Sequence, residues 1–203
     1  TTTSSSQPAW REKAQSVIQS VTGSSGTKNS NSTTTGKTTA SSTSQLANLT
    51  YKNQQIVKVN GDQPTFTKAQ LSTSKGAWQE YHNLDSLNRV TGADALLAKS
   101  LMPSAEREPL YVSPTGWHNK RITYQSKTDW LYNRSHLIGY QLTGQNNNPK
   151  NLMTGTRSLN APGMENYESD VASYLKSHPS DYVRYQVTPV FRNTELLARG
   201  VHM

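Results

Sequence analysis

The second part of the chain, residues 49–203, is predicted to form one α+β domain, and three observations support that class. Short runs rich in β-branched and aromatic residues are bounded by turn residues, as strands usually are. Two of these runs, 121–125 and 130–132, flank the turn signal Lys127-Thr128-Asp129, which predicts a β-hairpin. The stretch 165–176 instead has apolar residues at helical spacing.

The other elements follow from local patterns. A first strand is expected at Ile56–Val59, ended by an Asn60-Gly61 turn. A short helix is expected over residues 93–99, closed before Pro103. Alternation over residues 182–190 predicts a late strand.

The helix over residues 165–176 is the clearest of these elements. Its apolar residues fall on one side of the helix, namely Tyr167, Val171, Tyr174 and Leu175. Pro162-Gly163 just before it predicts a break or kink in the chain. No internal repeat, P-loop or glycine-rich dinucleotide pattern is present, so a single ordinary domain is expected.

The first part of the chain, residues 1–48, has a different composition. From about residue 22 to residue 45 it consists almost wholly of Ser, Thr, Gly, Asn and Lys. Such a segment cannot bury enough apolar surface to offset the entropy of ordering, so we expect a disordered linker. Ahead of it, a short amphipathic helix is expected from apolar residues at helical spacing: Trp10, Ala14, Val17, Ile18 and Val21.

The segment Asn133-Arg134-Ser135-His136 contains the most suggestive side chains. The imidazole of His136 is mostly neutral at physiological pH, so it can accept a proton from water. Strand alternation would place Arg134 on the same face, where a guanidinium suits a phosphate. On these residues alone, the alternative is an ordinary structural or surface histidine beside an arginine.

A set of motifs along the rest of the chain favours a catalytic histidine over a structural one. Over residues 51–203 the chain resembles the secreted DNA/RNA non-specific endonucleases, and most closely the streptococcal-type DNases among them. The matching segments, in order, are 83–90, 101–107, 113–117, 132–142, 151–160 and 187–191.

The resemblance implies a ββα-metal (His-Me finger) core built on an antiparallel sheet with flanking helices. A hairpin would present His136 as the general base, and a following helix would present Asn160 as the protein ligand to Mg²⁺, with Mn²⁺ as a second suitable ion. Glu168, eight residues later (168 − 160), would hold a metal-bound water. Without the resemblance, Asn160 is as easily a helix-capping or turn residue, and Glu168 a solvated charge on a helix face.

The chain departs from the family pattern at three places. Asn133 stands where many relatives have Asp, so we expect His136 to be oriented by a backbone carbonyl instead. The position four residues after Glu168 is Ala172, where some relatives have Arg. The cation that stabilises the transition state must then come from Arg89, Arg134 or Arg157; Arg134 is expected to act in catalysis, and Arg89, Asn133 and Arg157 in substrate binding.

The third departure is the end of the chain. Relatives continue past a segment like Arg199–Met203 into further strands, so the domain is expected to be truncated there or unusually short.

Composition agrees with a polyanionic partner. The chain has 21 Lys+Arg against 13 Asp+Glu, a formal net charge of +8 and a pI of about 9.7. A generic basic extracellular protein would show the same balance. Near the predicted hairpin, Trp117, Trp130 and Tyr132 could stack on bases, although strand aromatics more often belong to the core.

We therefore predict a secreted, Mg²⁺-dependent, sequence-non-specific endonuclease with DNA favoured as substrate and with RNA as the second substrate that the family implies. No run of about 18 apolar residues is present, so no stable membrane insertion is expected. There is no cysteine and hence no disulfide, so export is inferred from the tail and the resemblance. The alternatives are a catalytically inactive, surface-tethered nucleic-acid-binding protein and a wall-associated adhesin. The sequence does not define the oligomeric state.

Overall fold

The computed structural model describes residues 43–203, and its centre is a four-stranded antiparallel sheet. The strand order is β1 (Trp78–Tyr81), β2 (Ala93–Leu97), β7 (Val183–Val190) and β8 (Gly200–His202). The late strand expected from alternation is thus confirmed as β7. The amphipathic helix and nearly all of the linker expected in residues 1–48 lie outside the described residues; only α2 (Thr43–Leu46) belongs to the structure there.

Strand β2 corrects the helix that the sequence predicted over residues 93–99. Every residue of β2 is buried, because β1 and β7 pair with its two edges and both of its faces are covered. Ala93, Ala95 and Leu97 point into the main core, whereas Asp94 faces the other way. A short run that is apolar on both faces has no period of two, so it cannot be told from a buried helix by its pattern.

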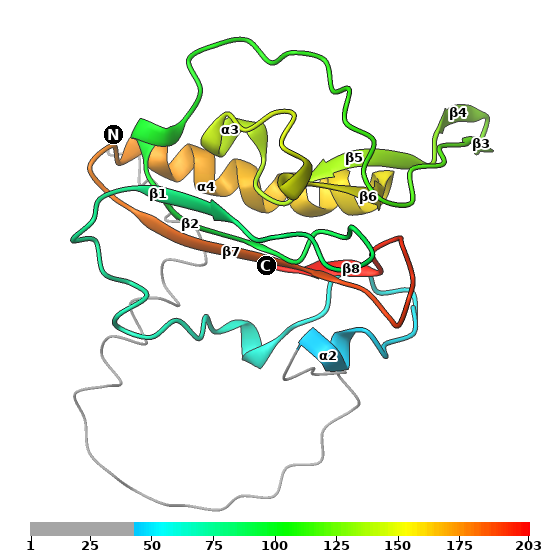
Figure 1. Ribbon diagram of the computed structural model, residues 1–203, viewed down its shortest axis with the longest axis horizontal. Coiled ribbons are helices and arrows are strands. Elements are labelled where there is room, and N and C mark those ends of the chain that lie inside the picture. The colour runs from blue at the N-terminus through cyan, green and yellow to red at the C-terminus, as the bar shows by residue number, and fades with distance from the viewer. Residues whose placement is uncertain (1–42) are drawn as a thin grey trace, which may run out of the picture.

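The second face of the sheet is covered by residues 43–75, which run beneath it in Figure 1. The Arg184 side chain lies against the rings of Phe66 and Trp78, with its guanidinium carbon 4.6 Å and 5.0 Å from the ring centroids, and pairs with Asp94. These contacts attach the early segment to the back of the sheet. Within the described residues, no helix is both long and apolar enough to cross a membrane.

The strand expected at Ile56–Val59 does not form. Only Val59 makes an isolated bridge, and Ile56 is 55% exposed. The expected turn does form, as the short helix η1 (Asn60–Asp62), with Gly61 at φ 64°. β-prone residues become a strand only where a neighbour supplies the ladder and a packed face, and none is present here.

A ββα unit lies over the first face of the sheet (Figure 1). Strands β5 (Tyr132–His136) and β6 (Leu152–Thr156) pair antiparallel, with His136 opposite Leu152. The chain then passes through η4 (Leu159–Met164) into α4 (Glu165–Ser177). Between the strands lie α3 (Tyr140–Thr143) and η3 (Pro149–Asn151), while η2 (Lys99–Leu101) follows β2.

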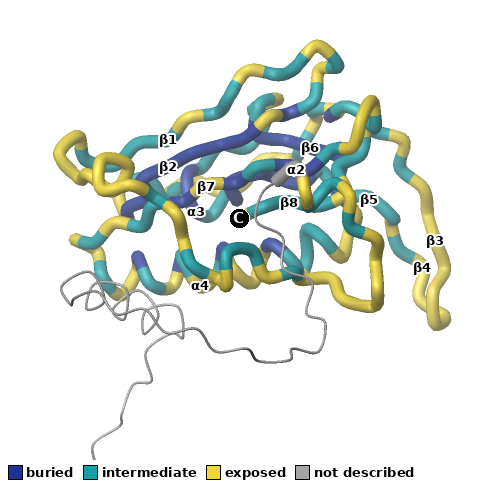
Figure 2. Tube along the Cα trace, turned by 90° about the horizontal axis from the view of Figure 1, so that it is seen from below, coloured by how far each residue is buried: buried dark blue, intermediate teal, exposed yellow. Residues whose placement is uncertain are grey.

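One core joins the ββα unit to the sheet. Residues from both layers pack together there: Val90, Ala93, Ala95, Leu97, Leu137, Ile138, Leu142, Met153, Met164, Ala172, Leu175, Tyr185 and Val187. Figure 2 shows this burial concentrated along β2, β7 and the inner side of the ββα unit. The elements that carry the candidate site residues therefore pack on this shared core.

The predicted helix α4 is confirmed, and Val171, Tyr174 and Leu175 of its expected apolar side pack in or against the core. Glu168, Ala172 and Leu175 are buried, whereas Tyr167 is 46% exposed. A solvated position for Glu168 is therefore wrong. The predicted break is present before the helix, because Ala161 is extended (φ −135°, ψ 116°) inside η4.

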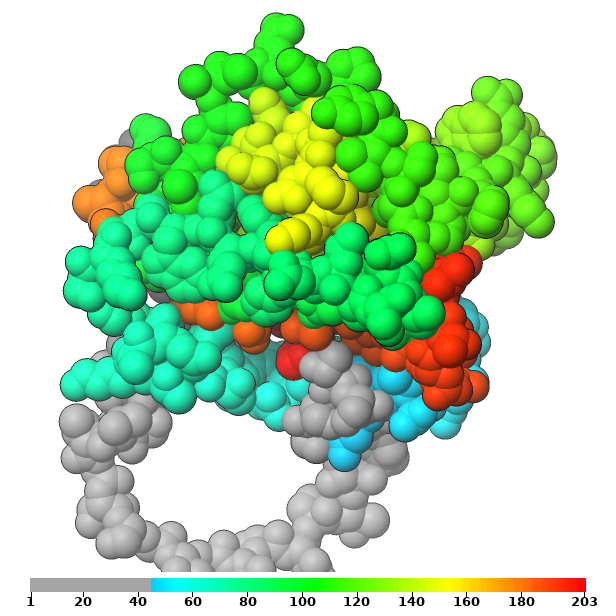
Figure 3. Space-filling view, in the orientation of Figure 1, coloured from blue at the N-terminus to red at the C-terminus, as the bar shows by residue number. Residues whose placement is uncertain are grey.

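The hairpin predicted around residues 121–132 is confirmed, with its turn shifted. Strands β3 (Arg121–Tyr124) and β4 (Lys127–Trp130) are joined by Gln125-Ser126, both at positive φ, as tight two-residue hairpins require. Figure 3 shows this hairpin standing off from the body at the upper right. It does not contain His136: that residue ends β5, so the hairpin that presents it is β5–β6.

Candidate active site

His136 is buried at the end of β5, with only 6% of its surface exposed. Its Nε2 lies 2.8 Å from the backbone oxygen of Asn146. A carbonyl can only accept, so Nε2 donates the proton and, in the neutral ring, Nδ1 keeps its lone pair. The expectation that a backbone carbonyl orients His136 is confirmed.

The protonation state of His136 follows from its surroundings. Burial lowers the pKa of the imidazole below its ordinary value; the bond to Asn146 opposes this, and the positive charge of Arg107 adds to it. The ring is therefore neutral at pH 7, with a basic nitrogen that makes no hydrogen bond to any described residue.

Asparagines between α3 and β6 hold the loop above His136. Asn146 donates from Nδ2 to the Glu108 oxygen (2.7 Å) and accepts from Arg107 Nε (3.2 Å). Asn147 bonds to the Pro109 oxygen and accepts from the Tyr111 N–H. One short segment thus fixes both the histidine ring and the loop that contains Arg107.

Asn151 anchors the chain just beyond His136. Its fully buried amide accepts from the Ile138 N–H (2.9 Å) and donates to the Ile138 oxygen (3.0 Å). Sequence reasoning missed the roles of Asn146 and Asn151. The available signal was the run Gln145-Asn146-Asn147-Asn148, which is unusually rich in side-chain amides.

Glu168 brings α4 to the same place. Burial raises the pKa of its carboxyl to about 7, while the Gly139 N–H, which bonds to it, lowers that pKa; Glu165 raises it and Arg107 lowers it. A Cβ at Gly139 would collide with the Glu168 carboxylate. Because Gly139 follows His136 by only three positions, the carboxylate lies against the backbone next to the histidine.

Asn160 lines an open hollow of about 600 Å³ together with Asn133, Arg134 and Arg107. Its side chain makes no hydrogen bond to residues 43–203, and no side-chain cap is present at the start of η4 or of α4. A capping role is therefore excluded, and the carboxamide oxygen is available. The remaining lining residues are Leu110, Trp117, Asn119, Trp130 and Tyr132.

The residues present fit a hard divalent cation. Within the described part of the chain, no three His, Cys, Asp or Glu side chains come together as a metal cage. Mg²⁺ needs no such cage, because it keeps several waters and is often bound through one or two protein oxygens. The amide oxygen of Asn160, which pairs with no residue of 43–203, is an oxygen of this kind.

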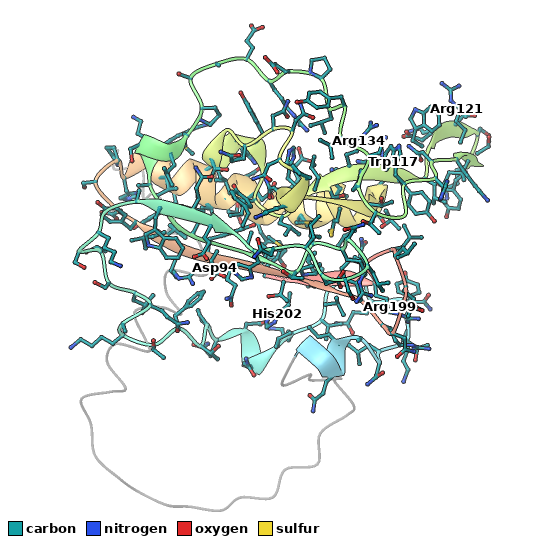
Figure 4. All side chains as sticks on the ribbon, viewed as in Figure 1. Asp94, Trp117, Arg121, Arg134, Arg199 and His202 are labelled. Atoms are coloured by element: carbon teal, nitrogen blue, oxygen red, sulfur yellow. The ribbon has the colours of Figure 1, made fainter. Side chains whose placement is uncertain are left out.

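Arg134 faces the hollow from β5. Its Nε donates to the Val112 oxygen (2.6 Å), and its guanidinium lies over the Trp117 ring, 4.4 Å from the centroid. Figure 4 shows Arg134 and Trp117 beside each other near the root of the outer hairpin, with Arg121 farther out. The two terminal amines of Arg134 remain free to bind an anion, because no described residue pairs with them.

The structure does not bring Arg89 and Arg157 into the hollow. Arg89 pairs with Asp85 and donates to the oxygens of Asn193 and Glu195, which ties down the loop after β7. Arg157 pairs with Asp129 on β4. Substrate binding by these two arginines stays a prediction.

Arg107 is the cation that sequence reasoning overlooked. It lines the hollow, and its charge acts on both His136 and Glu168. It comes from the long loop between η2 and β3, and the available signal was its place at the end of the matching segment 101–107. Only the fold of that loop over β5 places it at the site.

This chain is similar to a known protein family. Residues 71–203 match the family described as DNA/RNA non-specific endonuclease. A comparison with curated proteins found no match.

Solved structures are similar as well. NucA from Streptococcus agalactiae, with a magnesium ion bound, has a TM-score of 0.60 and 25% identity over 70% of this chain and 69% of that one. Sda1 nuclease with a bound zinc ion has a TM-score of 0.55 and 26% identity over 61% and 66%. A protein described as an extracellular endonuclease has a TM-score of 0.52 and 27% identity over 66% and 64%. This chain thus spans about two thirds of the length of each.

These likenesses confirm the ββα-metal fold that the sequence predicted. The family match extends over more than half of the sequence, from residue 71 to residue 203. The chain belongs to the DNA/RNA non-specific endonucleases, a family of hydrolytic nucleases.

Proposed function

We propose that this protein is a secreted, sequence-non-specific endonuclease that hydrolyses phosphodiester bonds of DNA, and also of RNA, with one Mg²⁺ and with His136 as general base. One observation supports this above all. His136 is buried and neutral, and its Nε2 donates to the Asn146 oxygen, so its Nδ1 is free to take a proton. Arg107 lines the same hollow as the amide of Asn160, and its charge acts on His136.

The proposed reaction begins at His136. Nδ1 accepts a proton from a water molecule, and the resulting hydroxide attacks phosphorus as the bond to the sugar oxygen breaks. The guanidinium groups of Arg107 and Arg134 bind phosphate oxygens and stabilise the charge that develops there. These two arginines would replace the arginine that some relatives have at the position of Ala172.

Asn160 and Glu168 form the proposed metal side of the site. Asn160 would bind the ion through its carboxamide oxygen, and Glu168 would accept hydrogen bonds from metal-bound water. When bound, the ion supplies positive charge at the phosphate and acidifies a water that can protonate the departing oxygen. Mg²⁺ is favoured over Zn²⁺ because the available ligands are oxygens, and Mn²⁺ suits the same set.

Secretion is proposed on two grounds. One structural relative is described as an extracellular endonuclease. The first 48 residues are dominated by Ser, Thr and Gly, which suits a tail or a tether at the cell surface.

A nuclease assay with a chelator control tests the proposal. Purified protein should shorten plasmid DNA, single-stranded DNA and RNA in Mg²⁺ and should stop when EDTA is added. A protein that shifts the mobility of DNA without shortening it, with or without Mg²⁺, would be an inactive binder and would overturn the proposal.

A further inference from the structure

The hollow beside Asn160 has an aromatic half. Trp117, Trp130 and Tyr132 line it, and Trp130 is 46% exposed. The sequence left open whether these rings belong to the core or to a binding surface. None of them is part of the packed core, so they form a surface wall that continues up to the proposed metal ligand.

Two of the rings already hold a guanidinium. Arg134 lies over Trp117, and Arg121 lies 5.0 Å from the centroid of Trp130, its partner across β3 and β4. An indole with a stacked guanidinium presents flat π surfaces together with positive charge. That combination suits a nucleobase and its phosphate, because bases stack both on aromatic rings and on arginine planes.

The wall is fixed in place relative to Asn160. The Asn119 side chain accepts from the Tyr132 N–H and donates to the Tyr132 oxygen, both at 3.0 Å. It thus makes two hydrogen bonds to the backbone of Tyr132, as a neighbouring strand would, at the base of the outer hairpin. Arg157, three residues before Asn160, bonds through its N–H to the Leu131 oxygen (3.0 Å) and pairs with Asp129. A base held by this wall would stay in a defined position beside the scissile phosphate.

We infer that the aromatic half of the hollow is a nucleobase-binding site, which takes an unstacked base next to the phosphate to be cleaved and so favours single-stranded nucleic acid. This inference rests on the proposed function for the identity of the ligand. Bases inside a duplex are already stacked on each other, so they must be pulled out before they can occupy the site.

Binding measurements without divalent ions test this site apart from cleavage. A labelled oligothymidylate is compared, by fluorescence anisotropy in EDTA, with an abasic oligonucleotide of equal length and charge. The wild-type protein should bind the base-containing strand about tenfold more tightly. Trp130→Ala should remove that preference while leaving the affinity for the abasic strand unchanged.

Two further variants sharpen the result. Trp130→Phe should keep most of the preference, because it keeps a ring. Tyr124→Ala removes an even more exposed aromatic side chain from the same hairpin outside the hollow, and should change nothing. Thermal melts of each variant establish that it is folded.

The inference is overturned if the wild type binds both strands equally, or if Tyr124→Ala lowers the preference as much as Trp130→Ala. Either result would leave cleavage in Mg²⁺ intact. Conversely, a protein that keeps the base preference but cleaves nothing in Mg²⁺ would overturn the proposed function and leave the base site standing.

Discussion

The molecule has two hairpins that follow one another in the chain and differ in how far they are buried. In β5–β6, Ser135, His136 and the first four residues of β6 are buried, and the pair is locked to α4 and the main sheet. In β3–β4 nearly every residue is exposed, and the pair projects from the body (Figures 1 and 2). The inner hairpin holds the proposed base in a fixed position. The outer one presents exposed charge and rings that suit contact with a polymer, and only its root at Trp130 is fixed beside the hollow.

Removal of the base should give the largest effect. His136→Ala should lower kcat by about 10²–10⁴-fold, because it removes the imidazole nitrogen that is proposed to take the proton from water. Steady-state cleavage of plasmid DNA measures it, with circular dichroism to establish folding. His178→Ala at the end of α4 is the matched control and should keep full activity; if His136→Ala did the same, the assignment of the base would be wrong.

Loss of the proposed metal ligand should come next. Asn160→Ala should raise the Mg²⁺ concentration needed for half-maximal activity by about tenfold or more, because it removes the oxygen that is proposed to bind the ion. Asn133→Ala, which removes a second amide from the same hollow, should change KM and leave the Mg²⁺ titration in place. Identical titrations for Asn160→Ala and wild type would sink the ligand assignment.

Replacing Glu168 should raise the free energy of unfolding at high pH and lower the activity. Its carboxyl has a pKa raised to about 7 by burial, so its contribution to stability is full below the unfolded pKa and is lost as pH rises through about 7. Metal-free Glu168→Gln should therefore be more stable than wild type at pH 8, by about 1–3 kcal/mol, and less active. Urea unfolding at pH 4 and pH 8 measures this; an equal gain at both values would contradict the electrostatic cause.

The pH profile should sharpen the contrast further. The base must be neutral, and burial holds the pKa of His136 below its ordinary value. The acid limb of kcat/KM at saturating Mg²⁺ should therefore lie below pH 6.5, the ordinary value of a free imidazole. A limb at higher pH would mean that the ring is more solvated than its burial indicates.

The smallest effect is expected on the outer hairpin. Lys127→Gln removes one exposed charge, so it should reduce the slope of log affinity against log salt by about 1 and leave kcat unchanged. Stability should change by no more than about 0.5 kcal/mol. A large fall in kcat would show that the outer hairpin takes part in the chemistry and would end the contrast between the two hairpins.

The sequence was informative where local rules decide the outcome. The helix α4, the strand β7 and the outer hairpin follow from periodicity and turn residues. Strand β2 could not be recognised, because β7, one of the two strands that pair with it, lies far away in the sequence and because both of its faces are covered. The strand expected at Ile56–Val59 does not form, because its residues favour a strand but only Val59 makes a single bridge.

The site divides in the same way. The motif around His136 and the spacing of Asn160 and Glu168 could be read from the chain, and the structure brings Asn133, Arg134 and Asn160 to one hollow. Arg107 ends the matching segment 101–107 but was not assigned to the site, since its position depends on bonds between a long irregular loop and Asn146 and Asn147. Long-range side-chain contacts of this kind leave no periodic trace in a sequence.

Gly139 shows how little space separates the two ends of this site. The carboxylate of Glu168 occupies the volume that any larger residue at position 139 would need. Even one added methyl group would force the end of the Glu168 side chain out of its present position, although it would alter no charge and no reactive atom. The absence of a side chain at position 139 is thus what lets the Glu168 carboxylate lie against the backbone beside His136.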